Sequence, residues 1–310
     1  MLLEIYEGGD SALINDFCFA GLGMDVIRVD LDGVRMARRS LLLCAVATCT
    51  LCTIKPAKGC GVLMTPTSSI KALTFDMQGT VFNFYGPLVA AATSICQDTG
   101  LTTDWVKSLP GDWSGRAHEI ILDISAGRRQ WIPNSDVYRE ALMSILATGG
   151  LRDRFSGANI DKLMGVWAEM VAWPDAAEGI SALGRKFTVC TLTNASMSQM
   201  TALVKRNGLR FDEILTGELS QAYKPDPRVY QSAVKYTGFR PDELLMVSAH
   251  KWDLQASKRE GFKTAYVPRP LELGTGVADR APEQYIDIIA RDLVDLSLIL
   301  AGATRSASTR

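Results

Sequence analysis

A repeated unit of short strand, polar loop and helix most constrains the fold of this 310-residue chain. Strand-like segments occur around 73–75 and at Phe187–Leu192, Glu213–Thr216, Leu244–Ser248 and Thr264–Val267. This alternation predicts the α/β class, with a Rossmann-like, doubly wound parallel sheet that has helices on both faces. In such a sheet the functional side chains gather beyond the carboxyl ends of the strands.

Asp76 follows the first of these strands directly and precedes a turn at Gly79. A carboxylate in this place can act as a covalent nucleophile, which splits one difficult displacement into two easier ones. It can equally cap its own backbone, because Asp followed closely by Gly is common turn chemistry. The first strand alone leaves both interpretations open.

Three later segments carry polar residues at comparable places. Thr193 and Asn194 end one strand, although they could simply cap the next helix. Lys224 precedes a Pro-Asp-Pro turn, and a lysine held in a fixed position suits the neutralisation of an anion. The strand at 244–248 enters a polar loop that reaches Ser248 and Asp253, although Asp253 could serve only the helix dipole. Each segment is a weak signal by itself, so the order of all four matters.

The order strand-Asp, strand-Thr-Asn, Lys-Pro, strand-Ser-loop-Asp resembles the haloacid dehalogenase superfamily from about Ile70 to Pro268. Residues 224–230 and 248–253 further resemble its type II (S)-2-haloacid dehalogenase branch. The resemblance implies a helical cap inserted into the sheet domain. It also implies a hydrolase that acts on carbon-halide bonds and converts a small 2-haloacid to a 2-hydroxy acid through an aspartyl ester, without a cofactor.

The resemblance implies roles for individual residues. Asp76 would be the nucleophile, Thr80 and Lys224 would hold and neutralise its carboxylate, and Asp253 would position the water that hydrolyses the ester. Other residues would face the substrate: Thr193, Asn194, Tyr230, Ser248 and Trp252. For Tyr230 the alternative is simple packing on a helix face.

In this family an arginine of the cap closes over the site and contacts the halide or the substrate carboxylate. Arg116 is the best match for this arginine. The match rests on counting back from the helix that contains Tyr138. The alternative is an ordinary solvated arginine.

Gln78 and His250 depart from the branch and are expected to line the substrate pocket. Gln78 stands where an aromatic hydroxyl is usual, and His250 stands where an asparagine is usual. His250 is one of only two histidines. It could act as an acid, as a hydrogen-bond donor or as a plain loop residue.

Phosphate transfer is the rival chemistry, because phosphatases of the superfamily also use the first aspartate. They place a second carboxylic acid two residues later, and Gln78 cannot ionise. A lysine beside the site disfavours a divalent cation. We therefore expect no metal, with Mg²⁺ required only if the protein is a phosphatase. Further alternatives are a pathway-specific hydrolase for another substrate and a catalytically altered member that only binds.

The sequence divides into zones of different pattern. Residues 1–69 lack the strand and helix alternation and are expected to be a disordered, dispensable extension or a gene-model artefact, with Met64 as the functional start. The sheet domain is expected at 70–83 and 174–271, the helical cap at 84–173, and a C-terminal helix and tail at 272–310. Cap helices are expected around 118–125, 137–147 and 160–171, where apolar residues recur at three- and four-residue spacing. A CxxC at Cys49 and Cys52 lacks the partners of a zinc site.

The net charge of −1 and 47% apolar residues agree with a globular enzyme for a small carboxylic acid, without nucleic-acid or membrane partners. A homodimer is expected from the resemblance. A cytoplasmic location is expected, although the apolar run Leu41 to Ile54 leaves a secretory alternative.

Overall fold

The parallel sheet expected from the sequence is present in the computed structural model, which describes residues 69–274 and 276–302. Six strands pair in the order β5-β4-β1-β6-β7-β8, and every neighbouring pair is parallel. The strands are β1 (Ala72–Phe75), β4 (Thr188–Thr193), β5 (Glu213–Thr216), β6 (Leu244–Ser248), β7 (Lys263–Tyr266) and β8 (Ile288–Ile289). The predicted fold class is confirmed.

The central strands are buried on both sides, which explains their nearly continuous apolar sequences. All four residues of β1 and all five of β6 are buried. Leu73 and Phe75 pack on one face of the sheet, in a core cluster shared with Val247. Ala72 packs on the other face with Met246. Successive residues thus feed two separate cores, as the two-residue period of a strand requires.

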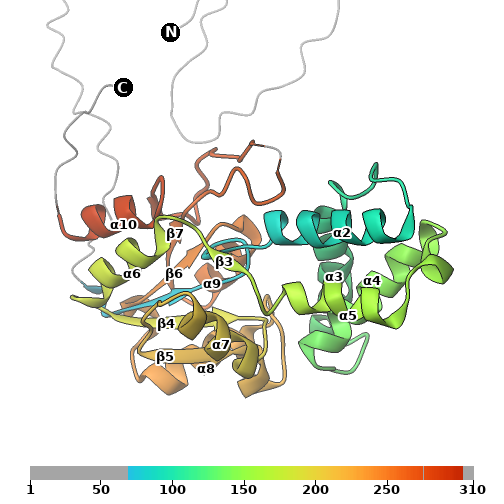
Figure 1. The fold of residues 1–310 in the computed structure, drawn as a ribbon. Helices are drawn as coiled ribbons and strands as arrows, with labels where there is room; N and C mark the ends of the chain where they lie inside the picture. Colours follow the sequence, from blue (N-terminus) through green and yellow to red (C-terminus); the bar gives the residue numbers. More distant parts are fainter. Residues whose placement is uncertain (1–68, 275, 303–310) are drawn as a thin grey trace, which may run out of the picture. The chain divides into compact units, whose positions relative to one another are not determined.

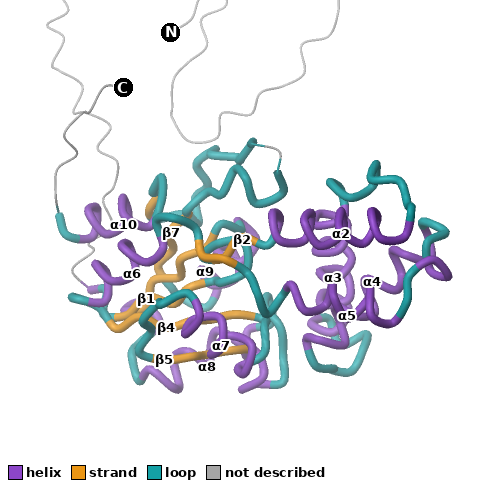
Figure 2. The backbone as a smooth tube through the Cα atoms, in the orientation of Figure 1, coloured by secondary structure: helices purple, strands orange, loops and turns teal. Residues whose placement is uncertain are grey.

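Helices cover both faces (Figures 1 and 2). Buried side chains of α6 (Ala176–Gly184), α7 (Met197–Arg206) and α10 (Leu293–Leu300) join the first core cluster. Those of α8 (Pro227–Thr237) and α9 (Lys251–Arg259) join the second. Short 3-10 turns, η3 (Gly217–Ser220) and η4 (Pro241–Glu243), precede α8 and β6. The sheet is therefore doubly wound.

Four helices lie beside the sheet (Figure 1). In the sequence they lie between two short strands that pair antiparallel, β2 (Phe82–Asn83) and β3 (Val171–Ala172). They are α2 (Tyr85–Thr99), α3 (Leu109–Ser125), α4 (Asn134–Thr148) and α5 (Gly157–Val166), with a 3-10 turn, η2 (Arg152–Arg154), before α5. The third predicted cap helix is too long, because α5 ends at Val166 and the chain then turns to form β3. β8 was not predicted at all.

The CxxC, the apolar run 41–54 and the proposed start at Met64 lie outside the described residues. Among the residues that the structure does describe, no helix is both long and apolar enough to cross a membrane.

Candidate active site

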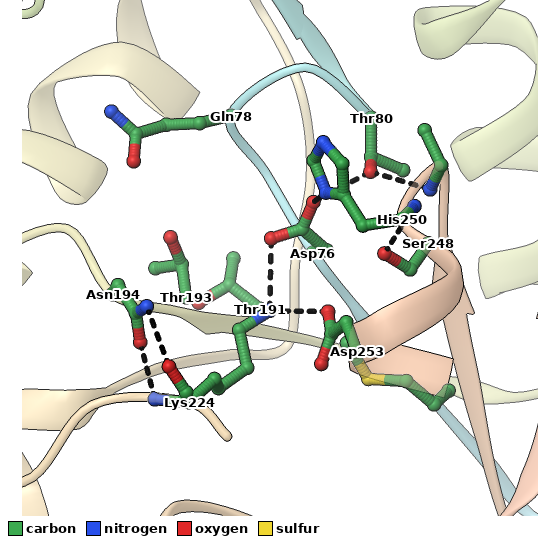
Figure 3. A network of polar contacts seen from close by, with 12 residues as sticks. Asp76, Gln78, Thr80, Thr191, Thr193, Asn194, Lys224, Ser248, His250 and Asp253 are labelled. Carbon is green, nitrogen blue, oxygen red and sulfur yellow. Dashed lines mark hydrogen bonds and ion pairs between the residues drawn. The ribbon is translucent and has the colours of Figure 1, made fainter. Parts of the chain in front are cut away.

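The polar residues expected at the strand ends do meet at one edge of the sheet (Figure 3). Asp76 comes directly after β1, Thr193 ends β4 and Ser248 ends β6. Because β1 lies between β4 and β6 in register, the carboxyl ends of these three strands are adjacent. Lys224 reaches the same edge from the loop before α8, and Asp253 does so from the first turn of α9.

Lys224 links two carboxylates. Its Nζ donates to Asp76 Oδ1 at 2.8 Å and to Asp253 Oδ2 at 2.6 Å. The ammonium group is almost fully buried, as are both acids. A buried charge is tolerated only when it is paired and hydrogen-bonded, so these three groups stabilise one another.

The second oxygen of Asp76 is held from another side. Thr80 Oγ1 donates to Asp76 Oδ2 at 2.6 Å, and His250 Nδ1 lies 3.0 Å from the same oxygen. The backbone N–H of Ala249 in turn donates to Thr80 Oγ1 at 2.8 Å, which fixes the hydroxyl. Asp76 therefore has two partners on Oδ2 and one on Oδ1.

These contacts set the charge of Asp76. Burial by itself would raise the pKa of its carboxyl, but Lys224 and His250 outweigh burial and lower the pKa well below its usual range. The opposite holds at Asp253, where burial and the nearby charge of Asp76 raise the pKa despite Lys224. Asp76 is therefore ionised at neutral pH, the form in which a carboxylate can act as a nucleophile.

Tyr230 and Ser248 support the site from behind. The Tyr230 hydroxyl donates to Asp253 Oδ1 at 2.7 Å, and Ser248 Oγ accepts from the backbone N–H of His250 at 3.0 Å. Both side chains are fully buried. Neither lies on the wall of the cavity described below, so the structure places them behind Asp76 and Lys224 and not against a substrate.

Asn194 and Thr193 have different surroundings. The Asn194 amide accepts from the backbone N–H of Lys224 at 2.7 Å and donates to its carbonyl at 3.3 Å, and Asn194 also lines the cavity. Thr193 is buried, and its Oγ1 accepts from the backbone N–H of Ala195 at 3.3 Å. It does not line the cavity, so its expected substrate contact is not seen.

A cavity of about 280 Å³ lies above Asp76, between the sheet edge and the helices beside it. Its polar floor includes Asp76, Asn194, Lys224, His250 and Glu272, whereas much of its wall is apolar or aromatic: Phe84, Ile121, Tyr138, Trp167, Trp252 and Leu273. Trp252 lines the cavity as predicted and stacks beside His250. A polar floor under an apolar wall suits a small organic anion.

Arg116 does not reach this cavity, which corrects the prediction from sequence. Its guanidinium pairs with Glu119 at 2.6 Å, and both side chains are exposed. The face of α3 toward the cavity carries Ser114 and His118. Residue 116 is two positions from each of them, about 200° around a helix of 3.6 residues per turn, so it points away. It lines a separate cavity between α3 and α4.

Glu272 and Tyr138, which contact predicted site residues, escaped the sequence analysis, as did cavity-lining residues such as His118. Glu272 Oε1 lies 2.8 Å from His250 Nε2, and the Tyr138 hydroxyl lies 3.4 Å from Gln78 Oε1. Gln78 lines the cavity as expected, and its buried amide nitrogen has no hydrogen-bond partner. Tyr138 lies on a helix of clear periodicity, which marked it only as a packing residue. Glu272 lies in an irregular segment after β7, where the sequence gives no signal.

The described residues contain no group of three or more His, Cys, Asp or Glu side chains arranged to hold a metal ion. The Lys224 ammonium instead occupies the space between Asp76 and Asp253. This arrangement suits a reaction in which a fixed ammonium group neutralises negative charge.

Comparison with known proteins adds an independent finding. A family model described as haloacid dehalogenase-like hydrolase matches residues 70–261. An (S)-2-haloacid dehalogenase of Burkholderia cepacia is 31% identical over 207 residues, which are 65% of this chain and 84% of that protein. A crystal structure of an L-2-haloacid dehalogenase, 30% identical, superposes with a TM-score of 0.69 and covers 76% of this chain and all of its own. A phosphoglycolate phosphatase of Pseudomonas aeruginosa is 24% identical over 233 residues, 72% of this chain and 78% of that protein.

Proposed function

Because this chain belongs to the haloacid dehalogenase-like hydrolases, as its sequence motifs led us to expect, we propose that it hydrolyses the carbon-halide bond of a small 2-haloacid. The product is a 2-hydroxy acid, and the intermediate is an ester on Asp76. One observation carries this proposal: Asp76 lies in the floor of a largely apolar cavity, paired with the Lys224 ammonium, and keeps one oxygen available for attack.

The available oxygen is Oδ1. A carboxylate oxygen has two lone pairs in the plane of the group. Thr80 and His250 occupy both on Oδ2, whereas Lys224 occupies only one on Oδ1. We therefore assign the attack on the substrate to Oδ1. An electron pair of Oδ1 forms the bond to C2, the carbon-halide pair leaves with the halide, and the carbon inverts.

Water then cleaves the ester. Asp253 takes a proton from the attacking water while the oxygen of that water bonds to Cγ of Asp76. The electron pair of the ester carbonyl moves to Oδ2. When the carbonyl re-forms, the Cγ–Oδ1 bond breaks, and the leaving alkoxide takes the proton from Asp253. The new carboxyl group of Asp76 releases its remaining proton to solvent. Oδ1 thus leaves in the product, and the oxygen of water remains in Asp76.

The substrate anion needs donors at the cavity wall. The unpartnered amide nitrogen of Gln78 is one, since a buried donor without an acceptor gains most from a ligand oxygen. Asn194 is another within the cavity. Trp252 and the aromatic wall would exclude water from Asp76 until a substrate is seated. The mechanism uses no metal or organic cofactor.

The experiment is halide release from (S)-2-chloropropionate in EDTA by the full chain and by Asp76→Asn. Asp98→Asn, a change at an exposed aspartate of α2, serves as the matched control. Release that disappears only in Asp76→Asn would support the proposal, because the variant loses its nucleophile but not its packing. No release from the wild type, together with phosphate release from a phosphate ester in Mg²⁺, would favour a phosphatase.

A single turnover in heavy-oxygen water tests the ester itself. The first product should be unlabelled, and the label should appear in Asp76. Label in the first product would mean direct attack by water and would exclude the ester.

A further inference from the structure

His250 lies between two carboxylates. Its Nδ1 is 3.0 Å from Asp76 Oδ2, and its Nε2 is 2.8 Å from Glu272 Oε1. Figure 3 shows the ring directed at Asp76. Glu272 comes from the segment after β7, far from Asp76 in sequence, and has no part in the catalytic steps described above.

These two contacts determine the protonation state of the ring. A neutral imidazole has one N–H and one bare nitrogen, so it can donate to only one of the two acids. The bare nitrogen would then face an oxygen that is itself only an acceptor. Only the imidazolium donates to both Asp76 and Glu272. Burial would lower the pKa of His250, but Glu272 and Asp76 outweigh burial and raise the pKa well above its usual value.

No other group that faces His250 strongly disfavours the imidazolium form of its ring. The charged and titratable groups that line the cavity with His250 are Asp76 after β1, Glu272 after β7, His118 on α3, Tyr138 on α4, and Lys224 on the far side of Asp76. Burial and the charge of His250 lower the pKa of His118, so His118 is neutral when His250 is charged. The cavity thus contains one imidazolium and one imidazole.

The position of the ring is fixed. His250 stacks on Trp252, with ring centroids 5.8 Å apart and planes 21° from parallel. Glu272 reaches His250 through space that a side chain at position 79 would fill, because a Cβ on Gly79 would lie 2.1 Å from Glu272 Oε1. Gly79 also has a φ of +79°, which favours glycine.

We propose that Glu272 is a positioning residue that holds the His250 imidazolium as a hydrogen-bond donor to the oxyanion formed on Asp76 Oδ2 during ester hydrolysis. This inference rests on the proposed function. When water attacks Cγ, the carbonyl electron pair moves to Oδ2, where Thr80 and His250 already donate. The charge develops between two fixed donors, and donors fixed in advance stabilise a transition state without further reorganisation. His250 keeps both protons throughout.

The first test needs no substrate. Nitrogen-detected NMR resolves the two imidazoles of the chain, and His118→Gln assigns them. The His250 ring should carry both protons at about pH 7 in the wild type and should lose one at lower pH in Glu272→Gln than in the wild type. Glu283→Gln, in the same segment but paired with Lys251, should leave the His250 titration unchanged. A neutral His250 ring in the wild type, or no shift in Glu272→Gln, would overturn the proposal.

The second test separates the two chemical steps. In rapid-quench experiments followed by intact-mass spectrometry, Glu272→Gln should slow ester hydrolysis about tenfold, less than the roughly 100-fold or larger cost of deleting an oxyanion donor outright. Ester formation should slow much less, so the ester should accumulate. Equal slowing of both steps would contradict the proposed role in the second step.

A double-mutant cycle shows whether Glu272 acts through His250. His250→Asn removes the charge and keeps a donor at this position. In that background, Glu272→Gln should have no further effect on ester hydrolysis. An additive effect would mean that Glu272 acts on its own. If the wild type forms no ester at all, the proposed function fails, whereas the NMR titration still decides whether Glu272 controls the ring.

Discussion

Lys224 is the residue on which the charge balance of the site most depends. Its side chain is 1% exposed, and its ammonium contacts Asp76 and Asp253 at once. Burial would lower the pKa of Lys224, but the two carboxylates raise it above its ordinary value. Without this cation the two acids would face each other in a buried space, where like charges cannot both ionise at low cost.

Lys224→Met should therefore destabilise the protein by about 3–5 kcal/mol, the usual cost of removing one partner of a buried ion pair. It should also abolish turnover, because the remaining carboxylates would share a proton. Urea unfolding at neutral pH measures the first effect. Lys162→Met is the control, since Lys162 is exposed and, among the described residues, hydrogen-bonds to the Ser94 side chain, and its effect should be far smaller. Equal losses in the two variants would refute the buried-pair argument.

The two histidines should change stability in different pH ranges. The pKa of His250 is raised from 6.5, so above about pH 6.5 the folded protein keeps a proton that the unfolded chain loses, and stability falls as pH rises. The pKa of His118 is lowered, so its effect lies below about pH 6.5, where stability falls as pH falls. Each slope has a ceiling of about 1.4 kcal/mol per pH unit.

Between about pH 7 and about pH 8, wild-type stability should accordingly decline, and the decline should flatten in His250→Asn. Urea denaturation at several pH values gives both curves. The same slope in wild type and variant would mean that another group titrates in this range.

At the scale of elements, α6 and α10 pack closely because of one glycine. A Cβ on Gly179 of α6 would lie 2.6 Å from the backbone carbon of Leu293, the first residue of α10. The start of α6 is also tied to the rest of the fold, since Asp175 pairs with Arg269 and accepts from the backbone N–H of Leu293. Arg269 further donates to the carbonyl of Thr80, so this contact also holds the loop that carries Asp76.

Gly179→Ala should lower the free energy of unfolding by about 1–3 kcal/mol, because the methyl group cannot fit without moving α10. Gly184→Ala in the same helix is the matched control. Its Cβ would meet only a Val189 methyl group at 3.5 Å, and alanine is the better helix former, so stability should be unchanged or higher. Thermal unfolding of both variants measures these changes in stability, and an equal loss of stability in both would reject the close-packing explanation.

At the scale of the whole molecule, the segment Val62–Arg310 forms one compact unit that contains the sheet, the helices beside it and the candidate site. A chain that starts at Met64 should therefore fold and retain the activity of the full chain. Gel filtration, circular dichroism and the halide assay measure this. An insoluble or inactive product would show that the preceding residues are needed. The homodimer implied by the resemblance stays a prediction, and light scattering would test it.

Most of the sheet could be predicted because its determinants are local. Short buried strands separated by helices can pair in only a few parallel sheet topologies. The strands predicted at 213–216 and 244–248 have the same bounds as β5 and β6. Less local features could not be predicted. β8 is too short to carry a pattern, and α5 ends before the apolar spacing stops because the chain turns there to pair β3 with β2.

The sequence, through its resemblance to the family, led us to expect Asp76, Lys224 and Asp253 in one site. The parallel sheet accounts for part of this, because the ends of β1 and β6, which lead to Asp76 and to the helix of Asp253, share one edge. Only the tertiary structure decided what surrounds them. Which face of α3 meets the cavity depends on how the helix is rotated, and this excluded Arg116. The contact of Glu272 with His250 depends on the path of an irregular segment. Neither the rotation of α3 nor the contact between Glu272 and His250 produces a periodic pattern in the sequence, because each arises from packing between parts that are distant in the chain.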